Sequence, residues 1–340
     1  MPTIDADCHV LETDRTWAYM GASERQYQPQ TVASVTPEGR KEFWLIDGRL
    51  HPRSDNVGKD TPEEAREMAN IDARLRHMDE LDVDTQVLYP TVFLRPISRR
   101  PEVDLAVCRS YNRWLADIWA HSRGRLRWAV VPPLLNMEQA LEELRFGHAH
   151  GACAVFMRGL EDQGRICDAY FHPLYREAAR LNLAIGVHSG IGHFEIHDFF
   201  AQEAGFCKFK LIVIGAFHSL ALSDVPTLFP DLRIGIIEVS AQWIPHALHD
   251  LASRFRRRGR TMPEDLLREY RFYVACQTDD DLDVVLSYAG QDNLIIGSDY
   301  GHADTSSELE ALRNLKRQGK VPARVIDNIL DDNPRAFYGL

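Results

Sequence analysis

Acidic and imidazole side chains stand at the ends of several short apolar runs in this sequence. Asp7 and His9 are two residues apart, and His188 and Asp299 end two later runs. Residues two apart on a strand point to the same face, so Asp7 and His9 are expected to act together. Two imidazoles and two carboxylates can hold a divalent cation and leave a position open for water or substrate. Zn²⁺ and Mn²⁺ both suit such a mixed set; its oxygen share favours Mn²⁺ without excluding Zn²⁺.

Further polar and aromatic residues occupy comparable positions. Arg158 and Glu238 end two other apolar runs, whereas Tyr89 and Trp44 carry large rings. Arg158 could bind a substrate carboxylate in a bidentate contact, or form a structural ion pair. Tyr89 and Trp44 could wall an aromatic substrate pocket, or belong to the core.

The elements that must position these residues alternate between strand and helix along the chain, which indicates βαβ units and a parallel sheet. The expected strands are Thr3–His9, Thr85–Pro90, Leu126–Val131, Ala154–Arg158, Ala184–His188, Arg233–Val239, Phe272–Cys276 and Leu294–Asp299. Helical patterns cover residues 73–82, 102–121, 137–149, 172–181, 205–221, 242–257, 279–289 and 305–316, and a closing helix is expected within Pro322–Leu340.

Eight strand–helix repeats predict an α/β fold of the (βα)8 TIM-barrel type. A doubly wound open sheet is the rival, but the regularity of the repeats disfavours it. No glycine-rich dinucleotide or phosphate loop follows any of the expected strands. In a barrel the C-terminal strand ends meet at one mouth, so the candidate residues should converge there.

Residues 12–70 interrupt this rhythm because they are longer than an ordinary barrel loop. Within them, Glu42–Ile46, the turn Asp47-Gly48, and Arg49–Leu50 predict a hairpin, since Asp-Gly favours a tight type I′ turn. We expect one barrel domain over residues 1–340, with 12–70 as an inserted, lid-like segment.

Composition excludes several other classes of protein. A net charge of −11 argues against a nucleic-acid surface, and the basic run Arg254–Arg260 fits a solvated helix end. No window approaches the roughly 18 apolar residues of a membrane span, and the N-terminus shows no signal peptide. The six scattered cysteines lack a CxxC pair, which indicates reduced thiols and a cytoplasmic location.

The sequence resembles the amidohydrolase-related family that contains aminocarboxymuconate semialdehyde decarboxylase and γ-resorcylate decarboxylase. The similarity spans most of the chain and is weakest in residues 13–70. It rests on IDADCHVLE at 4–12, Arg74–Asp79, VLYPT at 87–91, YNRWLAD at 111–117, FHPLYREAARLNLAIGVHSG at 171–190, FPDLRIGIIE at 229–238, Trp243–Pro245, IIGSDYGHAD at 295–304 and Asn333-Pro334.

The resemblance implies that His9, His188 and Asp299 ligate the metal, and Asp7 with them. The family's usual first motif is His-x-His, and here Asp7 replaces its first histidine. Many members place an acid–base histidine at the end of strand six, where this sequence has Glu238. Glu238 is therefore a candidate catalytic group, and His218 on the preceding helix is another source of an imidazole, unless it only packs on the helix surface.

Two functions use this ligand set. The first is non-oxidative decarboxylation of a hydroxylated aromatic or related unsaturated carboxylic acid, in which Asp299 protonates the carbon that loses carbon dioxide. The second is hydrolysis of a lactone or similar carbonyl substrate by an activated water, with Asp299 accepting its proton and Arg158 orienting the substrate acid. The acidic first-motif residue and the resemblance favour the decarboxylase. The family commonly forms dimers or tetramers, so the resemblance also implies self-association.

Overall fold

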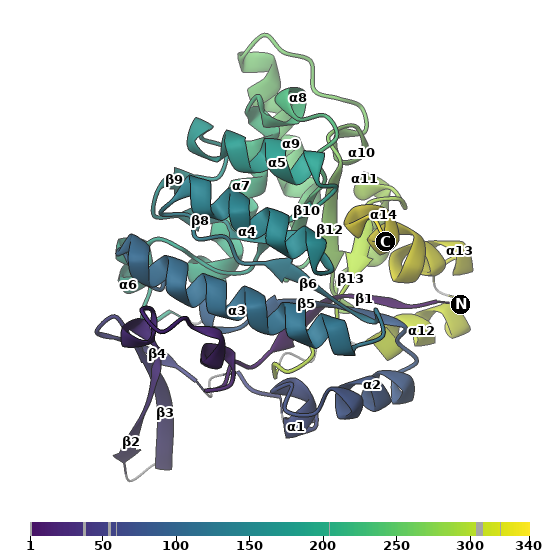
Figure 1. Cartoon of the computed structure of the whole chain (residues 1–340). Coiled ribbons are helices and arrows are strands. Elements are labelled where there is room, and N and C mark those ends of the chain that lie inside the picture. The colour runs from purple at the N-terminus through teal and green to yellow at the C-terminus, as the bar shows by residue number, and fades with distance from the viewer. Residues whose placement is uncertain are drawn as a thin grey trace.

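Eight parallel strands form one sheet that follows the order of the chain (Figure 1). The computed structural model describes residues 2–36, 39–53, 56–58, 60–203, 205–303, 309–319 and 321–340. The strands are β1 (Ile4–Val10), β5 (Thr85–Pro90), β6 (Leu126–Val130), β7 (Ala152–Arg158), β10 (Ala184–His188), β11 (Ile234–Ile237), β12 (Phe272–Cys276) and β13 (Leu294–Ile296). Most of their side chains are buried, as expected for a sheet covered on both faces.

The first and last strands meet and close the sheet into a barrel. The backbone N–H of Asp299 donates to the carbonyl of Asp7 at 3.0 Å, and that of His9 donates to Tyr300 at 2.8 Å. These bonds lie just beyond the end of β13, so closure depends on the turn that follows the strand. The predicted (βα)8 barrel is confirmed, although the last strand ends at Ile296 and not at Asp299.

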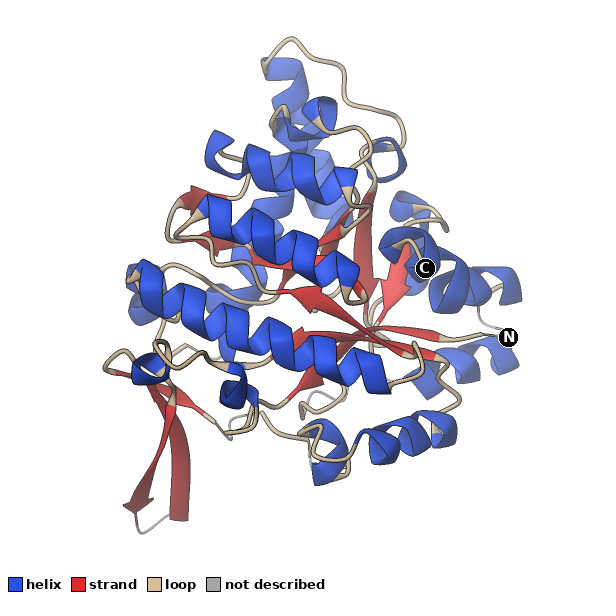
Figure 2. Cartoon of the chain, viewed as in Figure 1, coloured by secondary structure: helices blue, strands red, loops and turns tan. Residues whose placement is uncertain are grey.

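Helices surround the strands (Figure 2). The longer ones are α2 (Ile71–Glu80), α3 (Pro101–His121), α4 (Met137–Ala149), α5 (His172–Arg180), α7 (Leu211–Leu222), α9 (Ile244–Arg257), α11 (Leu282–Ala289) and α12 (Leu309–Gln318). Shorter helices are α1 (Glu63–Arg66), α6 (Phe194–Phe199), α8 (Val225–Leu228), α10 (Leu266–Glu269), α13 (Ala323–Asp327) and α14 (Asn333–Tyr338). The expected helix at 305–316 begins outside the described residues.

Side-chain caps explain where several helices begin. Asn70 and Asn136 accept hydrogen bonds from the backbone N–H groups of Ala73 and Gln139, and so cap α2 and α4. Such caps satisfy N–H groups that have no partner inside the helix. In the described part of the chain, no helix has both the length and the apolar character of a membrane span.

The excursion after β1 contains a three-stranded antiparallel sheet. Its strands are β2 (Gln30–Thr36), β3 (Gly39–Ile46) and β4 (Arg49–Pro52). Outside the excursion, a small hairpin after β7 pairs β8 (Leu160–Glu161) with β9 (Gly164–Arg165). The predicted β3–β4 hairpin is confirmed: Asp47 and Gly48 have φ values of 46° and 79°, as a type I′ turn requires. The strand β2 was not predicted.

The excursion contacts three loops at the C-terminal side of the barrel. Asp47 accepts a 2.5 Å hydrogen bond from Ser98 after β5, and Arg49 donates to Asp198 after β10 at 2.6 Å. Gly58 donates a backbone hydrogen bond of 2.9 Å to Gly301 after β13. These contacts support our proposal that residues 12–70 form a lid-like cover over the mouth of a single barrel domain.

Candidate metal centre at the barrel mouth

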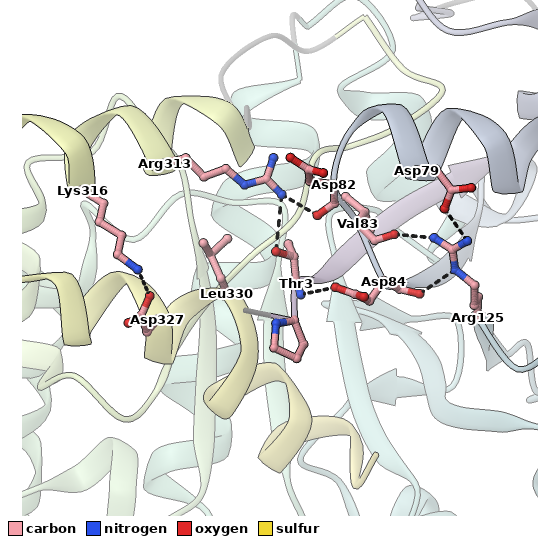
Figure 3. Close-up of a pocket in the computed structure, with 11 residues that line it drawn as sticks. Thr3, Asp79, Asp82, Val83, Asp84, Arg125, Arg313, Lys316, Asp327 and Leu330 are labelled. Atoms are coloured by element: carbon pink, nitrogen blue, oxygen red, sulfur yellow. Dashed lines mark hydrogen bonds and ion pairs between the residues drawn. The ribbon is translucent and has the colours of Figure 1, made fainter.

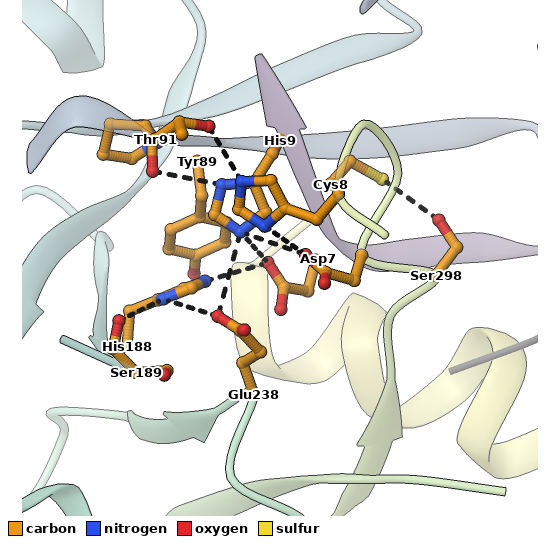
Figure 4. A network of polar contacts seen from close by, with 12 residues as sticks. Asp7, Cys8, His9, Tyr89, Thr91, His188, Ser189, Glu238 and Ser298 are labelled. Atoms are coloured by element: carbon orange, nitrogen blue, oxygen red, sulfur yellow. Dashed lines mark hydrogen bonds and ion pairs between the residues drawn. The ribbon is translucent and has the colours of Figure 1, made fainter. Parts of the chain in front are cut away.

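Four ligand-type side chains converge where the strands end (Figure 4). Asp7 and His9 come from β1, His188 ends β10, and Glu238 follows β11. One ligand atom from each residue lies within 4.8 Å of the others. Nε2 of His188 is 3.1 Å from Oδ1 of Asp7, and Nδ1 of His188 is 3.3 Å from Oε2 of Glu238. The separations are those of groups that can surround one cation.

Asp299 and His302 extend this group on the side of His9. Oδ1 of Asp299 lies 3.4 Å from Nε2 of His9 and 2.9 Å from Nδ1 of His302. His9, Asp299 and His302 form a second set of candidate ligands that shares His9 with the first. We call the six residues Asp7, His9, His188, Glu238, Asp299 and His302 the carboxylate–histidine cluster. All four proposed ligands belong to it.

His9 tests whether the cluster fits a metal. Its Nδ1 lies 3.1 Å from the carbonyl of Pro90, which can only accept, so Nδ1 carries the hydrogen. Burial, then the neighbouring His302 and His188, hold the pKa of His9 well below its ordinary value, which keeps the ring neutral. Its Nε2 is therefore a buried lone pair that has no hydrogen-bond partner among the described residues and lies close to carboxylates. This is the form in which histidine ligates metals.

Three carboxylates inside a buried site also require positive charge nearby. The pKa of His188 shows the effect of these negative charges. Burial alone would lower this pKa, but Asp7 and Glu238 raise it to about 9. Asp7 and Asp299 are almost fully buried, so solvent screens this field poorly. The donor set of nitrogen and oxygen fits a divalent cation such as Zn²⁺ or Mn²⁺.

The backbone at two cluster residues is unusual. Glu238 has φ 62° and Asp299 has φ 52°, the left-handed region that glycine normally occupies. Such strain costs on the order of 1–3 kcal/mol per residue and persists where surrounding structure enforces it. Each residue turns the chain sharply just after its strand, which brings its carboxylate into the mouth.

Arg158, predicted to bind a substrate acid, is engaged elsewhere. Its guanidinium donates to both carboxylate oxygens of Glu161, at 3.1 and 2.5 Å, and to the carbonyls of Phe93 and Arg95. The alternative reading, a structural ion pair, is the one the structure supports. Arg158 ties the loop after β5 to β7.

The two aromatic candidates are also buried in packing. Tyr89 is fully buried beneath His188, with ring centroids 4.9 Å apart, and its hydroxyl contacts that of Tyr338 at 2.9 Å. Trp44 is 2 % exposed and packs edge-on against Trp17 inside the excursion. Both rings are packed among other described residues, which favours the alternative that they belong to the core over an aromatic substrate wall.

His218 does not join the cluster. Its Nε2 lies 2.8 Å from Asp250 on α9, in a cavity of about 700 Å³ between outer helices. The position on α7 turns the ring toward neighbouring helices because only strand ends and their loops reach the mouth. The suggestion that His218 supplies the catalytic imidazole is therefore corrected.

Sequence reasoning missed a group of basic side chains at the mouth. We call His51, Arg95, His197 and Lys208 the basic group; they come from β4, the loop after β5, and the segment after β10. The loops are joined by a 3.0 Å hydrogen bond from Ile191 to the carbonyl of Leu94. Burial, then Arg95, His197 and Arg49, lower the pKa of His51 to about 4. Cations thus lie close to His51, although His197 also contacts the carboxylate of Asp198 at 3.2 Å.

A cavity of about 570 Å³ lies at the opposite end of the barrel, beside the starts of β1 and β5 (Figure 3). Its cations are engaged: Arg125 pairs with Asp79 at 2.6 Å, Lys316 pairs with Asp327, and Arg313 donates to main-chain carbonyls. Residues at this end of a barrel usually serve stability. The ion pairs and hydrogen bonds around this cavity therefore hold the outer helices against the barrel.

Gly297 provides a test of the closure beside Asp7. A Cβ added at Gly297 would lie 2.2 Å from Cβ of Asp7, whereas one added at Gly215 on α7 would meet open space. We expect Gly297→Ala to lower the free energy of unfolding by about 1–3 kcal/mol, the usual cost of overpacking, and metal affinity about 10-fold. Urea unfolding and metal titration measure both. Gly215→Ala is the matched control and should leave both unchanged or raise stability slightly; equal behaviour of the two variants would contradict the expectation.

The fold and the cluster define a class: a (βα)8 barrel with a candidate divalent-metal centre at the C-terminal ends of its strands. The amidohydrolase family model matches residues 4–340, and the chain belongs to this family. The resemblance seen in the sequence motifs is thereby confirmed.

Solved structures with the same fold include three informative ones. An amidohydrolase from Mycobacterium avium subsp. paratuberculosis K-10 is 21 % identical, with 100 % of this chain and 98 % of that chain covered, at a TM-score of 0.80. The 5-carboxyvanillate decarboxylase of Novosphingobium aromaticivorans DSM 12444, solved with manganese and 4-hydroxy-3-methoxy-5-nitrobenzoic acid, is 15 % identical, with 100 % and 96 % covered, at 0.70. The 2,6-dihydroxybenzoate decarboxylase from Rhizobium is 16 % identical, with 100 % and 99 % covered, at 0.65.

Proposed function

We propose that this chain is a metal-dependent non-oxidative decarboxylase of a hydroxylated aromatic or related unsaturated carboxylic acid. One observation carries the proposal: Oδ1 of the buried Asp299 lies 3.4 Å from Nε2 of His9, the nitrogen that is free to ligate a metal, at the edge of the cluster. A carboxyl group so placed can touch both the cation and the substrate carbon. Two of the similar structures are aromatic-acid decarboxylases, which supports this choice.

The chain's own residues divide the chemistry in the following way. Asp7, His9, His188 and Asp299 hold the cation, and Glu238 lies close enough to complete the set or to relay a proton. A divalent ion bound there supplies positive charge that stabilises negative charge on the substrate's carboxylate and hydroxyl oxygens. Asp299 delivers a proton to the ring carbon that carries the carboxylate. The bond to the carboxylate then breaks, its electrons return to the ring, and carbon dioxide leaves.

The basic group replaces Arg158 as the proposed element that attracts the substrate acid. Its four side chains converge from segments that border the mouth, and Nε2 of both His51 and His197 is buried without a hydrogen-bond partner among the described residues. An anion entering this region would be attracted by Arg95 and Lys208, and the two imidazoles could hydrogen-bond to it. Because the group lies outside the metal cluster, it should act on binding and not on the chemical step.

The function is tested by carbon dioxide release from hydroxybenzoates and related acids, using enzyme loaded separately with Mn²⁺ and Zn²⁺. Stoichiometric release of carbon dioxide with the decarboxylated ring as product is the expected result. A lactone panel with a pH indicator runs beside it, since proton release there, without carbon dioxide from any acid, would favour the hydrolase. Light scattering on the same preparation tests the proposed homodimer or homotetramer.

For the basic group, we expect His51→Leu to raise KM by about 10-fold and to leave kcat within about 3-fold, because it removes a buried ring nitrogen that can hydrogen-bond to the substrate acid and does not touch the reacting atoms. Steady-state kinetics with the acid identified above give both constants. His218→Leu, on the outer helices, is the matched control and should behave as the wild type. An unchanged KM in His51→Leu, in a variant that melts normally, would remove the basic group from substrate binding.

A further inference from the structure

His302 sits in the cluster although it ends no strand. The backbone N–H of His302 donates to the carbonyl of Asp299 at 3.0 Å, which closes a four-residue turn. Gly301 occupies the third position of this turn with φ 98°, a value that a type II turn requires and that glycine adopts freely. The turn folds the side chain of His302 back over Asp299.

Two contacts fix the ring of His302 on β1 and at the start of the loop after β5. It stacks on His9 with centroids 3.8 Å apart and 24° between planes, and its Nε2 lies 3.0 Å from Oγ1 of Thr91. Thr91 donates its own hydroxyl hydrogen to the carbonyl of Val10 at 2.8 Å, so it accepts the hydrogen on Nε2 of His302. The ring is thus anchored to the main chain of β1.

The remaining nitrogen of His302 faces Asp299. Nδ1 lies 2.9 Å from Oδ1 of that carboxylate, and both side chains are at least 95 % buried. The covering segment keeps water away: Val57 pairs with His302, and the carbonyl of Asn56 accepts from Ala303 at 2.9 Å. With its hydrogen on Nε2, Nδ1 can only accept, so this contact restrains the Asp299 carboxyl group through the proton that Asp299 carries as donor.

We infer that His302 is a positioning residue that holds Asp299 in its working orientation, through a chain of contacts anchored at Thr91 and Val10. The inference rests on the proposed role of Asp299 as proton donor. His302 does not touch the substrate in the proposed site. It acts on the rate because a proton donor must point at its target, and misorientation by about 1 Å can cost on the order of 100-fold.

Three variants separate positioning from mere packing. His302→Phe keeps a ring that can stack on His9 and removes both nitrogens. His302→Asn restores a polar atom near the position of Nδ1, and Thr91→Val removes the hydroxyl that anchors Nε2. We expect His302→Phe to keep its metal and its KM within about 3-fold, and to lose kcat by about 10–100-fold, the range for groups that orient metal ligands. His302→Asn should recover at least about 10-fold of that loss, and Thr91→Val should fall between wild type and His302→Phe.

A second readout does not depend on turnover. The visible absorption of the cobalt-loaded protein reports the arrangement of groups around the metal, and it should change in His302→Phe and return toward the wild type in His302→Asn. Unchanged spectrum and kcat in His302→Phe would overturn the inference, as would an Asn variant no better than Phe. Loss of metal from His302→Phe would also overturn it, because His302 would then be a ligand.

If the wild type releases no carbon dioxide, the proposed function fails, while the cobalt spectra still decide the role of His302. Should His302→Phe fail to fold, Thr91→Val gives the same two readouts.

Discussion

Asp299→Asn should keep most of its metal and lose at least about 100-fold in kcat, the usual scale for removing an acid–base group. The amide oxygen of asparagine can still ligate, but the side chain carries no transferable proton. The loss therefore falls on the chemical step. Asp299 is 1 % exposed and contacts both His9 and His302, so bulk water is a poor substitute for its proton.

Metal content by elemental analysis and single-turnover rates with the identified acid measure the two effects separately. Glu238→Gln is the informative comparison, since Glu238 contacts His188 at 3.3 Å from the other side of the cluster. We expect Glu238→Gln to lower turnover more than metal content. Near-normal turnover in metal-loaded Asp299→Asn would show that the proton travels through another group, with Glu238 the next candidate.

His9→Ala should abolish metal binding, reducing the content from about one ion per chain to less than about a tenth. His9 is fully buried, is held neutral, and presents its Nε2 lone pair to both sets of candidate ligands. Its removal takes away a nitrogen ligand that both candidate sets share. The remaining carboxylates and His188 then offer an incomplete set of ligands for the cation. Elemental analysis of protein purified without chelator, then titration with Mn²⁺, measures the loss.

His188→Ala is expected to behave in the same way, and His218→Ala supplies the matched control. His218 is a histidine outside the cluster, paired with Asp250 on the outer helices, so its removal should leave metal content unchanged. Circular dichroism confirms that each variant is folded. A His9→Ala variant that keeps a full complement of metal would show that the site is misassigned.

Much of the site follows from local spacing in the sequence. Asp7 and His9 point to the same side because strand side chains alternate, and this needs no knowledge of the rest of the fold. His188 ends a short buried run that reads as a strand of a parallel sheet. The Asp47-Gly48 turn is equally local, because its backbone conformation is set by the two residues themselves.

The predicted roles of Arg158, Tyr89 and Trp44 in substrate binding were not supported for a different reason, which is the packing of other segments around each side chain. Arg158 ends its strand as predicted, but Glu161 lies three residues later and the β8–β9 hairpin folds it back onto the guanidinium. The acid at this spacing was the signal for an ion pair. Tyr89 and Trp44 could not be told from pocket residues because burial depends on which elements pack over them.

What the sequence by itself determined is the order of eight strands and the ligand types at their ends, because alternation and apolar runs are properties of neighbouring residues. Only the tertiary structure decided how the carboxylates meet. Glu238 and Asp299 lie beyond their strands in left-handed backbone conformations, so strand alternation does not fix their direction. His302 reaches Asp299 through a turn held by Gly301 and covered by a segment some 245 positions away in the chain, residues 56–58. Contacts between distant segments depend on barrel closure, and no local pattern encodes them.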